Sequence, residues 1–147
     1  MGRPFETELN QLHETIDWAN SINVEAISKL ISKYHDPVYI VGSGGSFSTC
    51  IYAADLLTSK GVFAKAVTPL ELFYANATLR KSNIIFISAS GNNTDILFAY
   101  KKAIESEPLS ILSICMRKNS KLATLSSIYS GCTTVGFDPP AGKDGFL

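Results

Sequence analysis

Two strand-turn-helix patterns of the same kind limit how this chain can fold. In the first, the apolar run at residues 38–41 is followed by Gly42-Ser43-Gly44-Gly45-Ser46. In the second, the apolar run at residues 83–87 is followed by Ser88-Ala89-Ser90-Gly91. Continuous apolar runs of this length are typical of parallel strands that are covered on both faces. Because the carboxyl ends of parallel strands lie at one edge of a sheet, we expect the two turns to meet there.

The rest of the chain predicts an α/β three-layer sandwich. Further strands are expected at residues 62–67, 109–115 and 132–135, and helices at 46–60, 68–79 and 122–125, with one more helix that follows the second turn and ends at about residue 105. The helix after the second strand begins with a predicted capping box, in which Thr68 is the cap, Pro69 follows it and Glu71 is the third residue. Two amphipathic helices are expected within residues 1–36. The alternation predicts a single domain over residues 1–147, with helices on both faces of a five-stranded parallel sheet and the N-terminal helices packed on it.

Composition excludes several classes of protein. The chain has 147 residues, of which 46% are hydrophobic and 18% are charged, with 13 basic and 13 acidic side chains. A balanced charge gives no electrostatic reason to expect nucleic acid or a membrane as partner. The three cysteines, Cys50, Cys115 and Cys132, match no zinc-binding spacing, and we expect them to be packing residues of a cytoplasmic protein without a bound metal.

The first turn lacks the residues of the common nucleotide and hydrolase motifs. A dinucleotide-binding turn needs glycine where Phe47 stands and an acidic residue near Thr68, at the end of the second strand. The one Gly-Lys pair, Gly142-Lys143, follows no first strand as a P-loop would. Ser46 lacks the second glycine of a hydrolase elbow. A flavodoxin-like FMN loop stays open as an alternative for the second turn, but we expect no cofactor.

The two turns have instead the composition of a site for a sugar phosphate. Glycines let the backbone approach a ligand, helix N-termini carry partial positive charge, and hydroxyl groups both donate to and accept from phosphate and sugar oxygens. Helix capping alone is the alternative explanation of these residues. The candidate binding residues are Ser43, Gly44, Gly45, Ser46, Ser88, Ala89, Ser90, Gly91, Asn93 and Thr94.

The pattern Gly42-x-Gly44-x-Ser46 after one strand and Ser88-x-Ser90-Gly91 after another resembles the sugar isomerase (SIS) domain family. The resemblance covers nearly the whole chain, including residues 141–144, and is strongest to one half of the two-SIS isomerase region of glucosamine-6-phosphate synthase. It implies a flavodoxin-like five-stranded sheet and phosphosugar binding, with Gly45 and Ser46 lining the phosphate from the first turn and Ser88, Ala89 and Ser90 from the second. The chain departs from the family pattern at Asn93, where the family has Ser or Thr, and at Ala89, where it often has Gln.

Catalysis is less well defined by the residues than binding. The family's isomerases use a glutamate, and often a histidine, from later segments or from another subunit. Glu71 is the one candidate here, although its capping role already explains it. Three readings therefore stay open: a phosphosugar-binding domain, an aldose–ketose isomerase or aminosugar-phosphate deaminase completed elsewhere, and a sugar-phosphate-sensing regulator. The loop-like residues 138–147 suggest a fragment, and we expect a second SIS domain or a second subunit, as in a homodimer.

Overall fold

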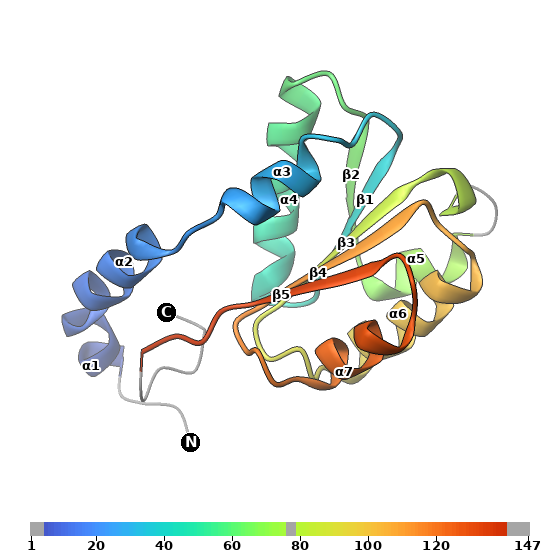
Figure 1. Ribbon diagram of the computed structural model, residues 1–147. Helices are drawn as coiled ribbons and strands as arrows, with labels where there is room; N and C mark the ends of the chain where they lie inside the picture. Colours follow the sequence, from blue (N-terminus) through green and yellow to red (C-terminus); the bar gives the residue numbers. More distant parts are fainter. Residues whose placement is uncertain (1–4, 76–78, 141–147) are drawn as a thin grey trace.

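The computed structural model describes residues 5–75 and 79–140 and contains one five-stranded parallel sheet (Figure 1). The strand order is β2-β1-β3-β4-β5. The strands are β1 (Val38–Val41), β2 (Ala64–Val67), β3 (Asn83–Ser88), β4 (Ser110–Cys115) and β5 (Cys132–Gly136). The predicted fold class is confirmed, with strands that begin and end within two residues of the expected positions.

The carboxyl ends of β1, β2 and β3 lie at the same edge of the sheet, and β3 extends two residues beyond the end of β1. Val41, the last residue of β1, pairs with Val67 of β2 on one side and with Phe86 of β3 on the other. β1 and β3 are thus neighbours although β2 lies between them in the sequence. The two glycine-serine turns therefore leave adjacent strands at the same edge of the sheet.

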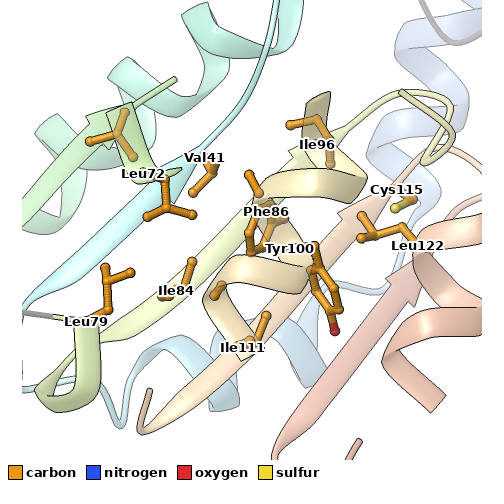
Figure 2. Packing of buried hydrophobic residues seen from close by; sticks show 13 residues of the cluster. Val41, Leu72, Leu79, Ile84, Phe86, Ile96, Tyr100, Ile111, Cys115 and Leu122 are labelled. Carbon is orange, nitrogen blue, oxygen red and sulfur yellow. The ribbon is translucent and has the colours of Figure 1, made fainter. Parts of the chain in front are cut away.

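Helices cover both faces of the sheet, as predicted. Figure 1 shows α3 (Glu25–Ile31) and α4 (Gly45–Ser59) on one face, and α5 (Pro69–Tyr74), α6 (Thr94–Glu105) and α7 (Lys121–Ile128) on the other. On the α6 face, Val41 and Phe86 of the sheet pack with Leu72, Ile96 and Tyr100 of the helices (Figure 2). On the other face, Ile40 and Ile85 pack with Cys50, Ala54 and Leu57 of α4. The two apolar clusters hold the turns in place, since each turn joins a core strand to a core helix.

Three helix predictions were wrong in their extent. The short helix expected at residues 122–125 is twice that length, as α7 runs over Lys121–Ile128. The helix that begins at Pro69 ends at Tyr74, and a separate 3-10 turn, η1 (Leu79–Lys81), follows, with residues 76–78 outside the described part of the chain. The first amphipathic stripe forms two helices, α1 (Phe5–Asn10) and α2 (Leu12–Ser21), because the backbone at Gln11 leaves the helical conformation (φ −101°, ψ 6°).

The first two helices lie apart from the sheet (Figure 1). α2 buries none of its residues, whereas Ile27, Leu30 and Ile31 of α3 pack against the α4 face of the core. Within the described ranges, the helices are too short or too polar to cross a membrane. Residues 141–144, which belong to the family resemblance, lie outside the described residues.

Candidate functional site

The two turns leave the sheet at its topological switch point. From β1 the strand order runs outward through β2 on one side and through β3, β4 and β5 on the other. The turn after β1 leads into α4 on one face, and the turn after β3 leads into α6 on the opposite face. Connections that diverge in this way leave a crevice outside the strand ends, which is where ligands of open α/β sheets bind.

The first turn depends on glycines and leaves the start of α4 without a side-chain cap. A Cβ on Gly42 would lie 2.5 Å from the sulfur of Cys50. The turn can therefore pack this closely against α4 only because residue 42 has no side chain. Gly44 has φ 58° and ψ −132°, a conformation that is open essentially to glycine alone. Gly44 is also the residue before α4 and has no side chain to accept a hydrogen bond. The first amides of α4, at Gly45 and Ser46, are therefore a partly positive group at the switch point.

The second turn is held by its own serines. The Ser88 Oγ accepts a hydrogen bond from the Gly91 amide at 3.1 Å, and the Ser90 Oγ accepts one from the Asn92 amide at 3.1 Å. Each hydroxyl keeps its own proton to donate. Gly91 has φ 64°, and a Cβ there would lie 2.6 Å from the Ser120 side chain, which explains the glycine. The turn thus presents two hydroxyl donors on a fixed backbone.

Asn93, rather than Thr94, reaches the site. Asn93 is the cap of α6, and its Oδ1 accepts a hydrogen bond from the Ile96 amide at 3.0 Å. This hydrogen bond uses the side-chain oxygen and leaves the NH₂ group of Asn93 as a donor. The Asn93 side chain lines a pocket between the two turns. Thr94 is exposed and does not line it.

A pocket of about 100 Å³ lies between the two turns. The candidate residues that line it are Ser43, Ser46, Ser88, Ala89, Ser90 and Asn93, whereas Gly44, Gly45, Gly91 and Thr94 shape the turns without lining it. Ile87 and Ile96 complete the wall and were not predicted, because apolar residues of a strand and a helix look like core in a sequence. None of these lining residues is charged, so a bound anion would be held by hydroxyls, amides and helix ends.

A larger pocket of about 520 Å³ adjoins the first, since Ser43 lines both. It lies between α5 and α6 and was not predicted from the sequence. Its walls are mainly apolar and aromatic, and Asp95 supplies the one carboxyl group among the lining residues; they comprise Ser43, Thr68, Pro69, Leu70, Phe73, Tyr74, Asp95 and Phe98. In the sequence these aromatic residues resemble the packing faces of two helices.

Glu71 has a structural role and lines neither pocket. Its Oε2 accepts a hydrogen bond from the Thr68 amide at 2.7 Å, and the Thr68 Oγ1 accepts one from the Glu71 amide at 3.2 Å. The predicted capping box is therefore confirmed. The hydrogen bond from the Thr68 backbone is the main reason that the pKa of Glu71 is lowered, which makes its carboxylate a weak base.

The buried cysteines are unsuited to nucleophilic chemistry. Burial raises the pKa of Cys50 to about 12 and also raises the pKa of Cys115, so both stay as thiols at neutral pH. All three cysteines are free. In the described part of the chain, no three His, Cys, Asp or Glu side chains are grouped closely enough to hold a metal ion.

Comparison with solved structures supports the fold expected from the SIS resemblance. The Vibrio vulnificus NanR protein complexed with ManNAc-6P is 19% identical over 99% of this chain and 56% of its own, with a TM-score of 0.71. Tagatose-6-phosphate ketose/aldose isomerase from Escherichia coli is 18% identical over 90% of this chain and 40% of its own, with a TM-score of 0.69. The C-terminal domain of glucosamine-fructose-6-phosphate aminotransferase from Francisella tularensis is 22% identical over 83% of this chain and 33% of its own, with a TM-score of 0.63.

These likenesses show a shared fold, and this chain spans between about one third and a little over half of each of those proteins. No protein-family model matches the sequence, and no curated protein matches it either.

Proposed function

We propose that this chain is a phosphosugar-binding domain of the SIS type. The observation that carries the proposal is the convergence of two serine-bearing turns on one pocket at the switch point of the sheet. The pocket combines the uncapped start of α4 with the hydroxyls of Ser46, Ser88 and Ser90. Helix ends and hydroxyls are the groups that hold phosphate where lysine and arginine are absent. Helix capping alone does not account for Ser46, since it lies inside α4 and caps nothing.

The proposal extends to a larger assembly. Two of the similar structures are named as a sugar-phosphate isomerase and an aminotransferase domain, and each is longer than this chain. We therefore propose that the domain works beside a second SIS domain or a second subunit, in a homodimer or a longer chain. The free cysteines are consistent with a cytoplasmic location.

Two roles for the whole protein remain as proposals. An aldose–ketose isomerase or an aminosugar-phosphate deaminase needs an acid–base group near the sugar, and Asp95 is the one carboxylate that lines either pocket among the described residues. Such an enzyme would need further groups from outside those residues or from the partner. A regulatory module needs no such group, and NanR, a structure of similar fold, was solved with ManNAc-6P. Turnover of a bound phosphosugar by the full-length protein would favour the enzyme.

A thermal-shift screen against hexose, pentose and aminosugar phosphates tests the binding proposal. At 100 times its Kd, a ligand adds about 2.7 kcal/mol to the stability of the native state. For a domain of this size, that raises Tm by roughly 5–10 °C. Inorganic phosphate is the control ligand for the phosphate group alone.

Serine variants show whether binding depends on the two turns. Loss of a hydrogen bond to a charged phosphate costs about 1.5–3 kcal/mol, so Ser46→Ala and Ser90→Ala are each expected to weaken binding roughly 10- to 100-fold. Ser59→Ala is the matched control on the same helix as Ser46, because the Ser59 hydroxyl is exposed and bonds only the Leu56 carbonyl at 2.7 Å. A folded protein that no phosphosugar stabilises, or equal loss in all three variants, would contradict the proposal.

A further inference from the structure

The pocket between α5 and α6 has an aromatic wall that the phosphate site does not explain. Phe73 of α5 stacks on Phe98 of α6 with ring centroids 4.9 Å apart and planes 23° from parallel. Tyr74 packs edge-on against Phe73 at 5.3 Å. Phe98 is 58% exposed and Tyr74 is 68% exposed, so part of each ring is open to a ligand. Aromatic surface held open in a concave site favours an apolar part of a ligand.

One carboxylate stands beside this wall. Asp95 lies three residues before Phe98 on α6, and residues at this spacing share a helix face. Both side chains line the pocket, together with the apolar Pro69 and Leu70. A carboxylate accepts hydrogen bonds and repels a second anionic group. The pocket therefore favours a group that combines an N–H donor with an apolar end.

The two pockets also differ in size, and each suits a different part of one ligand. The smaller, at about 100 Å³, is lined by hydroxyls and lies between the helix starts. The larger, at about 520 Å³, falls in the range of roughly 300–1,000 Å³ typical of small-molecule sites. Ser43 lines both, so the two pockets adjoin, which is the arrangement that a ligand with a phosphate at one end and a bulkier group at the other requires.

We propose that the ligand is an N-acylated amino sugar phosphate, with its phosphate between the turns and its acylamino group in the larger pocket. The amide N–H donates to the Asp95 carboxylate, and the acyl methyl group contacts the Phe73–Phe98 pair. A sugar without the acylamino group leaves the aromatic wall unused. A free amine could also donate a hydrogen bond to Asp95, but contact with the apolar Pro69 and Leu70 would remove its bound water, which costs free energy. This inference rests on the proposed phosphosugar site, because that site fixes the other end of the molecule.

Calorimetric titrations with matched sugar phosphates test the inference. The probes are N-acetylglucosamine-6-phosphate, glucosamine-6-phosphate and glucose-6-phosphate, each titrated into the whole chain. The acylated sugar is expected to bind at least 10-fold more tightly than either of the others. Phe98→Ala and Asp95→Ala are expected to remove most of that preference, by weakening the binding of the acylated sugar more than that of glucose-6-phosphate. Asp95→Asn, which keeps an accepting oxygen, is expected to retain it.

Phe63→Ala is the matched control for Phe98→Ala. Phe63 is 63% exposed and precedes β2, at the opposite edge of the sheet from the pockets, so its loss should leave all three affinities unchanged. Glucose-6-phosphate binding that depends on Ser90, without preference for the acylated sugar, would overturn the inference and leave the phosphosugar site standing. Tightest binding of glucosamine-6-phosphate would also overturn it. No binding of any of the three would overturn both.

Discussion

Replacement of Gly91 by alanine is the substitution for which the structure predicts the largest local cost at the site. Gly91 has φ 64°, and an added Cβ would lie 2.6 Å from both the Cβ and the Oγ of Ser120 and 3.1 Å from the Cys115 sulfur. Ser120 cannot move freely, because it is buried and its Oγ accepts a hydrogen bond from the Ala123 amide at the start of α7. The new methyl group must therefore displace the cap of a second helix.

The expected loss follows from two separate costs. The left-handed backbone costs about 1–2 kcal/mol for a residue with a Cβ. Overpacking against buried neighbours costs about 1–3 kcal/mol. Together these give a loss of roughly 2–5 kcal/mol in the free energy of unfolding, or a fall in Tm of about 4–20 °C for a domain of about 150 residues.

Urea unfolding of two further variants separates the backbone cost from the steric cost. Gly44→Ala is the control, because Gly44 also has a positive φ but a Cβ there would meet nothing within 4 Å. Gly91→Ala combined with Ser120→Gly removes the clashing side chain and should recover the steric part, since glycine is itself an acceptable N-cap. The reasoning is refuted if Gly91→Ala costs less than about 1 kcal/mol, or if Ser120→Gly recovers nothing.

Two further predictions concern the residues around the site. Thr68→Ala removes one half of the capping box and is expected to lower the unfolding free energy by about 1 kcal/mol in urea denaturation; an unchanged unfolding free energy would contradict the role of this cap in stability. Burial raises the pKa of Cys50 from its ordinary value of 9.0 to about 12. As the pH rises, the thiol therefore ionises first in the unfolded chain, and the free energy of unfolding is expected to fall between pH 9 and 12. Cys50→Ala should make that fall shallower, and an unchanged pH profile would contradict the burial argument.

The strands and their turns could be predicted because each rests on local sequence. β3 contains the apolar run at residues 84–87 and ends in Ser88, and the hydroxyls of Ser88 and Ser90 accept hydrogen bonds from amides of the turn. The capping box could be predicted for the same reason, since Thr68 and Glu71 satisfy each other's backbone. In each case the residues that make the structure lie within four positions of one another.

The features that escaped prediction depend on contacts between distant segments. The larger pocket joins Phe73 to Phe98, and no sequence motif connects them. The choice of Asn93 over Thr94 depends on the rotation of α6, which is set by the packing of Ile96 and Tyr100 against the sheet (Figure 2). The end of α5 at Tyr74 follows no glycine or proline signal, and the next residue, Ala75, simply turns to an extended conformation.

The most direct test of the central claim is a titration of the ¹⁵N-labelled chain with a phosphosugar, followed by the backbone amide resonances. If the two turns form one site, the amides of Gly45 and Ser46 and those of Ser90 and Gly91 shift together, with a single Kd. Inorganic phosphate should shift the same amides more weakly, while the amides of α2 remain unchanged. Shifts confined to one turn, or two different affinities for the two turns, would contradict a shared phosphosugar site.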